Sequence, residues 1–305
     1  MRDRLSATIW VVAALVVTGC GPNVLEAAPA TIVGAERYSL RARSVDETYQ
    51  IDVLAVVSPL RPLAPGEKLS VVFVLDGGLY FPLVASTATL LSLDAIPPIL
   101  LVGVGYDLDP ALSPGARTLQ VQARRNRDYT PSFDEAFVKQ MNDMYAQVGS
   151  TYPAYGRPGG ADAFLAFLNE ELKPFISQRY PNADTNDSSI VGHSFGGLFA
   201  LHVLFTAPES FDRYVAGSPS PWWGDGALFA SEAAAVLDID AQLFLSFGEL
   251  ESEDRMANPL RRLDSLLRDG RRSKLTYTLH PFADETHGSV VPATFSRGLR
   301  EVFKR

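Results

Sequence analysis

Ser194 stands in the run Gly192-His193-Ser194-Phe195-Gly196, which matches the pattern G-x-S-x-G. An apolar segment at 188–192 leads into this run, and a second at 198–205 leaves it. A strand, a sharp turn and a helix in that order lift a serine hydroxyl above a sheet, and the crowded turn needs glycines on both sides. We therefore expect Ser194 to be a nucleophile. The alternative is a glycine-rich turn whose serine only caps the helix.

A serine nucleophile needs a base, and the chain has four histidines. His287 lies between the last predicted strand and the last predicted helix. Enzymes with this kind of serine turn place their base there, in the chain order serine, acid, histidine. We expect His287 to be the base, with a surface or capping histidine as the alternative. His193 should point away from the nucleophile, His202 belongs to the following helix, and His280 closes a strand.

The acid is expected on the loop that follows the predicted strand 242–247. It would fix the tautomer of the imidazole and stabilise the imidazolium. A glycine followed three residues later by an acid favours Glu251, but a solvated loop that caps the next helix is the alternative for these side chains. Four carboxylates compete for the role: Glu249, Glu251, Glu253 and Asp254.

Two backbone amides are expected to stabilise the oxygen that becomes negative during attack. The Phe195 amide opens the helix after Ser194 and points toward that oxygen. The second donor should follow the first central strand, in the loop Asp76-Gly77-Gly78-Leu79-Tyr80. Because glycines allow an amide to approach a substrate closely, we expect Gly78 as this donor, with Gly77 next. A plain tight turn is the alternative.

The elements that must position these groups alternate between strands and helices. Residues 69–75 form a nearly continuous apolar run, typical of a strand buried on both faces. Residues 161–180 repeat apolar side chains at helical spacing. We therefore expect one α/β domain, with a mostly parallel sheet and helices on both faces. Residues 107–160 are less regular and predict an excursion over one sheet edge. The other predicted strands are 37–43, 48–57, 99–104, 188–192, 214–216, 242–247 and 275–279, and the other helices are 198–205, 256–267 and 292–303.

Composition excludes several classes of function. The chain has 305 residues, of which 47% are hydrophobic and 20% charged, with a net charge of −8, as in ordinary globular proteins. An acidic chain lacks the basic face that non-specific nucleic-acid binding needs. A single cysteine excludes an intrachain disulfide and zinc sites with several cysteines. The histidines make no metal-spaced pair, and Gly103-Val104-Gly105 lacks the third glycine of a dinucleotide fingerprint. We expect no nucleic acid, no metal and no cofactor.

The N-terminal segment is expected to lie outside the fold. Arg2 and Arg4 precede an uncharged apolar run at 7–17, which is too short to span a bilayer and fits a secretory signal. The run ends Val17-Thr18-Gly19-Cys20, which resembles a bacterial lipobox with an acylated cysteine. A plain signal peptide with an incidental cysteine is the alternative. We predict a signal peptide at 1–19, a lipid anchor on Cys20, a tether at 20–35 and the catalytic α/β domain at 36–305. The Gly21 that follows Cys20 favours the outer membrane, facing the periplasm or the cell surface.

Several further motifs occur together over residues 35–304, and with them the chain resembles a known esterase family. This family includes esterase D, the enterobactin and bacillibactin trilactone esterases, fungal triacetylfusarinine esterases and the mycolyl transferases. The resemblance implies an α/β-hydrolase fold, no metal and an acyl-enzyme on Ser194. Some of the trilactone esterases use only a serine and a histidine, so the acid stays open. The motifs are Leu75-Asp76-Gly77-Gly78, Gly103-Val104-Gly105-Tyr106, Arg127-Asp128-Tyr129-Thr130-Pro131, Glu171-Leu172-Lys173-Pro174-Phe175, Gly192 to Leu204, Pro208-Glu209-Ser210-Phe211, Ser218-Pro219-Ser220-Pro221-Trp222-Trp223 and Thr286-His287-Gly288-Ser289-Val290.

Four residues of these motifs are candidates for substrate binding. Tyr106 and Arg127 could line the cleft and hold an anionic or catecholate group; the alternative for Arg127 is a structural pair with an aspartate at the sheet edge. Trp222 and Trp223 could wall an acyl pocket, or they could simply pack together.

We therefore expect a lipid-anchored serine esterase for a small-molecule ester. Siderophore esters are the most attractive substrates, by family analogy alone, and small acyl or sugar esters come next. One alternative is an acyltransferase of the mycolyl-transferase type that uses the same residues. Another is a non-catalytic surface lipoprotein that binds a ligand.

Overall fold

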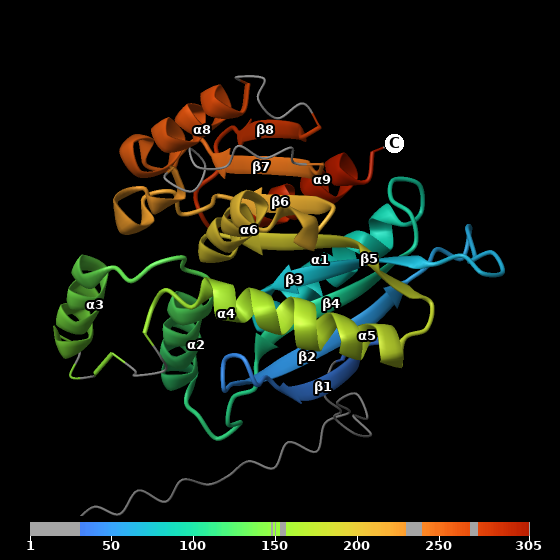
Figure 1. Ribbon diagram of the computed structural model, residues 1–305, viewed down its shortest axis with the longest axis horizontal. Helices are drawn as coiled ribbons and strands as arrows, with labels where there is room; N and C mark the ends of the chain where they lie inside the picture. The colour runs from blue at the N-terminus through green and yellow to red at the C-terminus, as the bar shows by residue number, and fades with distance from the viewer. Residues whose placement is uncertain are drawn as a thin grey trace, which may run out of the picture. The chain divides into compact units, whose positions relative to one another are not determined.

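A mixed sheet organises the part of the chain that positions the predicted site. The computed structural model describes residues 31–147, 149, 151–152, 157–229, 240–268 and 274–304. Within them the strands form one sheet in the order β1-β2-β4-β3-β5-β6-β7-β8 (Figure 1). The pairs β1–β2 and β2–β4 are antiparallel and all others are parallel. The strands are β1 Glu36–Arg41, β2 Thr48–Val56, β3 Leu69–Leu75, β4 Ile99–Tyr106, β5 Ala183–His193, β6 Arg213–Gly217, β7 Gln242–Gly248 and β8 Thr276–Phe282.

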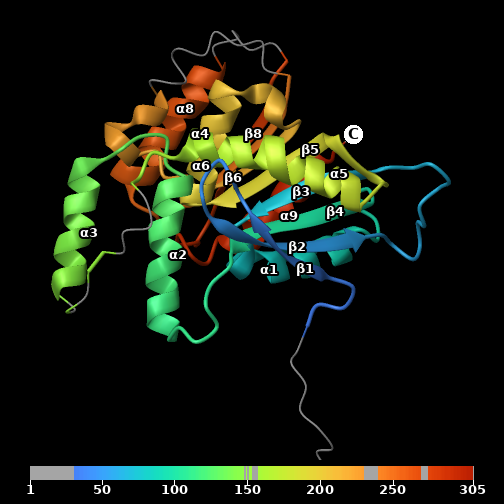
Figure 2. The same cartoon turned by 60° about the horizontal axis from the view of Figure 1, so that its bottom comes forward.

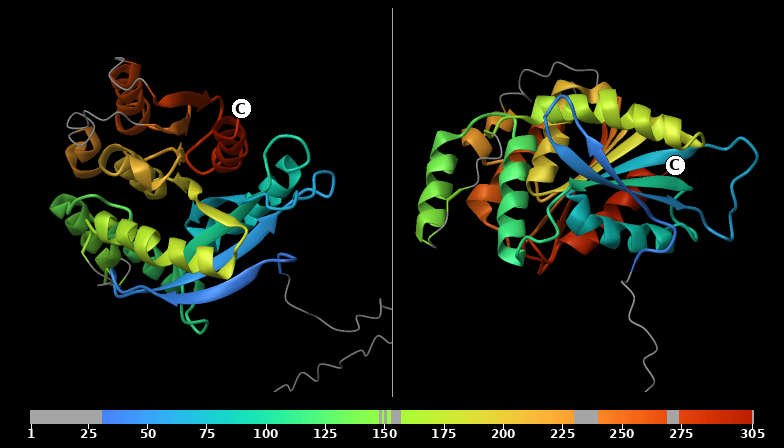
Figure 3. Two further views of the ribbon diagram at one scale, coloured as in Figure 1. Left: turned by 45° about the vertical axis from the view of Figure 1, so that its right-hand side comes forward. Right: turned by 90° about the horizontal axis from the view of Figure 1, so that it is seen from below.

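Helices cover both faces of this sheet, as the alternation of elements predicts. Helices α1 (Gly77–Leu91) and α9 (Val291–Val302) lie on one face, and α4 to α6 lie on the other (Figure 3). The expected fold class, an α/β-hydrolase fold with a mostly parallel sheet, is therefore confirmed. The other helical elements are α2 Pro114–Asp128, α3 Glu135–Gln147, α4 Ala161–Ala166, α5 Lys173–Arg179, α6 Phe195–Thr206, α8 Asn258–Arg268 and the short turns η1 Phe167–Leu172, η2 Pro208–Ser210, η3 Trp223–Asp225 and η4 Glu253–Ala257.

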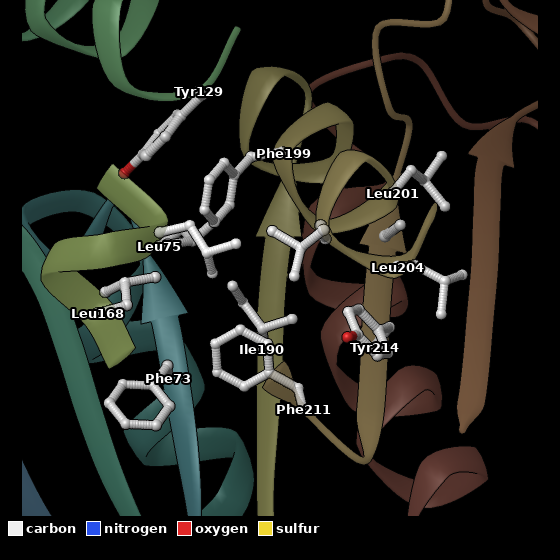
Figure 4. Close-up of a cluster of buried hydrophobic side chains, with 14 of the residues drawn as sticks. Phe73, Leu75, Tyr129, Leu168, Ile190, Phe199, Leu201, Leu204, Phe211 and Tyr214 are labelled. Carbon is white, nitrogen blue, oxygen red and sulfur yellow. The ribbon is translucent and has the colours of Figure 1, made fainter. Parts of the chain in front are cut away.

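A large hydrophobic cluster lies between the sheet and the α4–α6 layer (Figure 4). Buried side chains of α1 and α9, such as Val84 and Phe295, pack on the opposite face. Strand β3 is buried along its whole length, as expected of a central parallel strand. The segment 161–179 is one helical run whose middle, η1, is a π-helical segment. Helix α6 is buried at almost every position. Both elements bring apolar side chains, such as Leu168 and Phe199, to the side of the sheet on which Ile190 of β5 is buried.

Residues 107–160 differ from the prediction of an irregular excursion, because they contain α2 and α3. Both helices lie beyond one end of the sheet (Figure 2). Helix α2 begins after Ser113, whose hydroxyl accepts from the Ala116 amide at 3.3 Å, and Pro114 occupies its first turn. A capping serine before a proline is a helix-start signal that a periodicity search overlooks.

The predicted signal peptide, the lipid-anchor residue Cys20 and the tether up to residue 30 lie outside the described residues. The described residues from Val33 onward belong to one compact unit, which is the one described above. No helix among the residues that the structure describes is long and apolar enough to cross a membrane.

Candidate active site

Ser194 occupies a strained turn between β5 and α6. Its backbone has φ 59° and ψ −120°, an unusual conformation for a residue with a side chain. A Cβ on Gly192 would stand 2.3 Å from the carbonyl oxygen of Gly196, so this approach requires glycine. The Ser194 amide donates to the Gly217 carbonyl at 2.9 Å, which ties the turn to the end of β6. The partly exposed serine therefore stands at the carboxyl end of the parallel strands, as predicted.

Glu251 and His287 form a close pair at the same end of the sheet. The Nδ1 atom of His287 lies 2.6 Å from Oε2 of Glu251. The histidine side chain is 47% exposed and the glutamate side chain only 4%, so the imidazole faces the surface and the carboxylate lies beneath it. Among the four competing carboxylates of the loop, Glu251 is the one that the structure places against His287.

Two further donors hold the carboxylate of Glu251. Its Oε1 accepts from the Ser218 hydroxyl at 2.6 Å and from the Gly248 amide at 2.8 Å. Burial would raise the pKa of Glu251, but the bonds from His287, Ser218 and Gly248 together hold that pKa below its ordinary value. The carboxylate is therefore charged and oriented. Ser218 was not predicted as a site residue, although its place directly after β6 indicates the active end of the sheet.

Backbone hydrogen bonds join the loop of Glu251 to the loop of His287. The Glu249 amide donates to the Phe282 carbonyl at 2.9 Å, and the Leu250 amide donates to the Glu285 carbonyl at 2.9 Å. A Cβ on Gly248 would stand 2.2 Å from the oxygen of Glu285. The backbone contacts between the two loops therefore fix the distance between Glu251 and His287.

His287 also lies beside the serine turn. Its ring centroid is 4.6 Å from that of His193, the residue before Ser194. Burial, helped by the neighbouring His287, lowers the pKa of His193 to about 3, so His193 is neutral at physiological pH. Among the described contacts, the Ser194 hydroxyl makes no hydrogen bond to His287; such bonds often form only when substrate is present.

The predicted oxyanion donors lie on two adjacent segments. Phe195 opens α6, and its amide has no carbonyl partner inside the helix. The expected loop at Gly77 and Gly78 is instead the first turn of α1, with Asp76 before it in the left-handed region. The two segments meet at Gly196, where an added Cβ would stand 3.6 Å from Oδ2 of Asp76. In the first turn of α1, the Leu79 and Tyr80 amides donate to the Asp76 carbonyl at 2.8 and 2.9 Å. The Gly77 and Gly78 amides precede these bonds at the start of the helix, where backbone donors have no partner inside the helix.

Tyr106 and Arg127 do not extend into open space. The Tyr106 hydroxyl donates to Oδ2 of Asp128 at 3.1 Å, and Nε of Arg127 donates to Oδ1 of Asp128 at 2.6 Å. Arg127 also contacts Glu47 at 3.2 Å, and Asp128 is fully buried. The structure therefore favours the alternative of a structural pair with an aspartate, although this cluster lies at the end of the inner strand β4 and not at the sheet edge.

Trp222 and Trp223 have different surroundings. Trp223 is fully buried, and its indole nitrogen donates to the Ser132 carbonyl at 3.2 Å, which indicates packing. Trp222 is half-buried, and its ring centroid lies 5.8 Å from that of Phe195. The guanidinium of Arg255 stacks 4.2 Å from the Trp222 ring. Of the two tryptophans, Trp222 is the partly exposed one next to Phe195. Arg255 is a neighbour of Trp222 that the sequence did not reveal.

The other candidate histidines and a competing glutamate of the loop make different contacts. His202 is buried on α6 and faces Asp162 at 2.8 Å, while His280 packs between Phe244 and Phe282. Glu253 is ion-paired with Arg261 at 2.7 Å. Over the described ranges, no group of three or more His, Cys, Asp or Glu side chains is arranged to hold a metal ion.

A serine on a strained strand–helix turn, with a glutamate–histidine pair on later loops of a parallel sheet, defines a serine hydrolase of the α/β-hydrolase fold. Comparison with known proteins agrees with this class. Residues 133–286 match the family described as "Putative esterase". The chain belongs to this family, and it is a serine esterase.

Individual relatives match the chain over most of its length. It is 33% identical over 289 residues to the siderophore enterobactin esterase of Emericella nidulans, covering 83% of this chain and 89% of the relative. It is 29% identical over 281 residues to the ferri-bacillibactin esterase BesA of Bacillus subtilis, covering 88% and 90%. The crystal structure of the BES protein from Bacillus cereus superposes with a TM-score of 0.75 at 28% identity, covering 92% of this chain and 99% of that one.

Proposed function

We propose that this esterase hydrolyses the ester bonds of a siderophore through an acyl-enzyme on Ser194. The observation that carries the catalytic assignment is the 2.6 Å contact between Glu251 and His287 beside the strained turn of Ser194. A charged, buried carboxylate on Nδ1 leaves Nε2 of the imidazole as the base toward the serine.

The reaction then follows from these positions. Nε2 of His287 takes the proton of the Ser194 hydroxyl while Oγ attacks the ester carbonyl. The Phe195 and Gly78 amides stabilise the oxyanion of the tetrahedral intermediate. The C–O bond to the alcohol breaks, and His287 returns the proton to the leaving oxygen. A water molecule, deprotonated by His287, attacks the acyl-enzyme, and the acid leaves as Ser194 regains its proton.

The substrate class is supported by the relatives and by the wall of the site. Two relatives that match the chain over most of its length carry the names of enterobactin and bacillibactin esterases. The half-buried Trp222, with the cation of Arg255 on its ring, provides an aromatic and positively charged surface beside Phe195, the residue that follows Ser194. Such a surface suits a ligand that is both aromatic and anionic.

A hydrolysis panel tests this proposal. Ferric enterobactin, ferric bacillibactin and ferric triacetylfusarinine C would be compared with p-nitrophenyl acetate and butyrate, using wild type, Ser194→Ala, His287→Ala and Glu251→Ala. We expect the siderophores to be the better substrates, and each variant to lose activity on every ester. Preference for the small esters would reject the substrate class, and an unchanged rate for Glu251→Ala would reject the acid.

Two controls separate hydrolysis from the other candidate roles. A fluorophosphonate should label wild type and fail to label Ser194→Ala. Product analysis with added acceptor alcohols should give the free acid; a new ester as the main product would indicate acyl transfer instead.

We propose further that the enzyme is a lipoprotein anchored through Cys20, in the outer membrane and facing the periplasm or the cell surface. Support comes from the sequence, in which the uncharged apolar run at 7–17 precedes Val17-Thr18-Gly19-Cys20. Two or more acyl chains on one residue anchor a protein stably, whereas one chain gives only marginal binding.

A further inference from the structure

Asp76 has a backbone conformation that needs support from its surroundings. It follows β3 with φ 53° and ψ 42°, in the left-handed region that residues with a side chain seldom occupy. Gly77 and Gly78 come next and open α1. The conformation of Asp76 therefore sets the direction in which the first amides of this helix point.

Two side chains from the end of α2 hold Asp76. The Tyr129 hydroxyl accepts from the Asp76 amide at 3.1 Å, and Nε of Arg125 donates to Oδ1 of Asp76 at 2.6 Å. Asp76 is 6% exposed and Tyr129 is 1% exposed, so neither contact is shared with bulk water. We call Asp76, Arg125 and Tyr129 the Asp76 brace.

The brace lies between the two segments that are expected to stabilise the oxyanion. The other carboxylate oxygen of Asp76, Oδ2, is buried without a hydrogen-bond partner among the described residues. It lies 3.6 Å from the position of a Cβ on Gly196, in the first turn of α6. On the other side, a Cβ on Gly77 would stand 2.7 Å from the Val104 amide nitrogen, so α1 packs directly on β4. A half-satisfied buried carboxylate is costly, and its retention here calls for a role at this site.

We propose that Tyr129 is a positioning residue for the reaction, because its hydroxyl fixes the turn at Asp76 and thereby aims the Gly78 amide at the oxyanion. The inference rests on the proposed function, which makes Gly78 the second donor. It also gives a role to α2, a helix that carries none of the proposed catalytic residues. A donor that is misplaced by about 1 Å loses much of its effect on the transition state, while ground-state binding changes little.

The ring of Tyr129 has a separate structural task. Its centroid lies 5.5 Å from that of Phe164 and 6.0 Å from that of Phe199, at the edge of the buried cluster (Figure 4). Tyr129→Phe keeps this packing and removes only the hydroxyl. Tyr49→Phe is the matched control, because Tyr49 is also 1% exposed and its hydroxyl donates to a buried aspartate, Asp128, at 2.8 Å.

The test compares the two variants with wild type on p-nitrophenyl butyrate. We expect Tyr129→Phe to lower kcat about 10- to 100-fold with KM within about twofold, and Tyr49→Phe to keep the wild-type kcat. The affinity of Tyr129→Phe for an alkyl boronic acid, which mimics the tetrahedral intermediate, should fall by a factor similar to that of kcat/KM. A merely structural tyrosine would not change these two quantities together.

A second variant covers the case in which Tyr129→Phe does not fold. Arg125→Lys keeps the charge beside Asp76 but loses the planar Nε donor, so kcat should also fall with KM little changed. Wild-type kcat in either folded variant, or the same fall in Tyr49→Phe, would overturn the inference. Absence of fluorophosphonate labelling and of hydrolysis in wild type would instead overturn the proposed function.

Discussion

Single side chains around Glu251 show how a carboxylate is kept charged beneath a histidine. Glu251 receives bonds from His287, Ser218 and the Gly248 amide, and together they hold its pKa below the ordinary value despite burial. In the proposed reaction, a carboxylate that stays charged stabilises the imidazolium that would form when Ser194 loses its proton. Ser218 thus supports Glu251 by a hydrogen bond and takes no direct part in the proposed reaction.

Replacement of Ser218 by alanine tests this support. Because a hydrogen bond to a charged group contributes about 1.5–3 kcal/mol, we expect Ser218→Ala to lower kcat roughly tenfold. Glu251→Ala should lower it much further, by about 10³- to 10⁴-fold. Ser246→Ala is the control, since Ser246 is also buried and its hydroxyl contacts Thr294 at 2.9 Å rather than Glu251. Equal rates for the two serine variants would contradict the role of Ser218.

Arg255 on Trp222 leads to a prediction about substrate charge, which rests on the proposed function. A ferric tris-catecholate carries a net negative charge, so we expect Arg255→Gln to lower its kcat/KM about 3- to 10-fold more than that of neutral p-nitrophenyl acetate. The difference should shrink in high salt, because salt screens exposed charges. The control is Arg268→Gln on α8, an exposed arginine paired with Asp264 at 2.9 Å. If Arg268→Gln lowers kcat/KM for the ferric tris-catecholate by the same factor, the effect comes from the overall charge of the protein and not from Arg255.

Whole elements differ in how clearly the sequence predicts them. Strand β3 and helix α6 are buried almost throughout, so their apolar runs mark them directly. Helix α2 instead buries Arg124, Asn126 and Asp128, which leaves no apolar stripe for a periodicity search to find. The helix that supplies the Asp76 brace is therefore missed because its buried face is polar.

Lys173 connects the helical run 161–179 to the segment before β6. Its ammonium group donates to the Ser210 carbonyl and lies 4.3 Å from the Phe211 ring centroid. Burial lowers the pKa of Lys173 from its ordinary 10.5 to about 8, although the charge of Asp212 opposes the change. The unfolded chain therefore holds this proton more tightly than the native protein does.

This difference predicts a stability that depends on pH. Since the native pKa is the lower one, the contribution is complete above pH 10.5 and is lost as the pH falls through about 8. Relative to Lys173→Met, wild type should gain about 1–2 kcal/mol of unfolding free energy between about pH 8 and pH 10. Urea denaturation at the two pH values measures this gain. If the unfolding free energy of both proteins changes with pH by the same amount, the pKa of Lys173 is not lowered in the native protein.

At the scale of the whole molecule, the prediction to test is the lipid anchor on Cys20. If Cys20 is acylated, wild-type protein made in a bacterial host should take up an alkyne-labelled fatty acid and sediment with membranes. Cys20→Ser should take up no label and stay in the soluble fraction, with the same esterase activity per mole. Label on the serine variant, or none on wild type, would contradict the anchor.

Much of the site can be read from the order of residues along the chain. The strand–turn–helix run at Ser194 and the position of His287 after the last strand depend on neighbours in sequence, because backbone crowding and side-chain periodicity are local properties. The parallel sheet follows in the same way from alternating elements. These patterns identify the nucleophile turn, the histidine and the fold class.

Other features arise only when distant segments meet. Among four carboxylates in one loop, Glu251 meets His287 because backbone bonds from Glu249 and Leu250 join that loop to the end of β8. Tyr106 and Arg127 both bond to Asp128, because a buried charge needs partners. Tyr129 reaches Asp76 across more than fifty residues. Sheet order and loop packing set such contacts, and neither is a property of any short stretch of the chain.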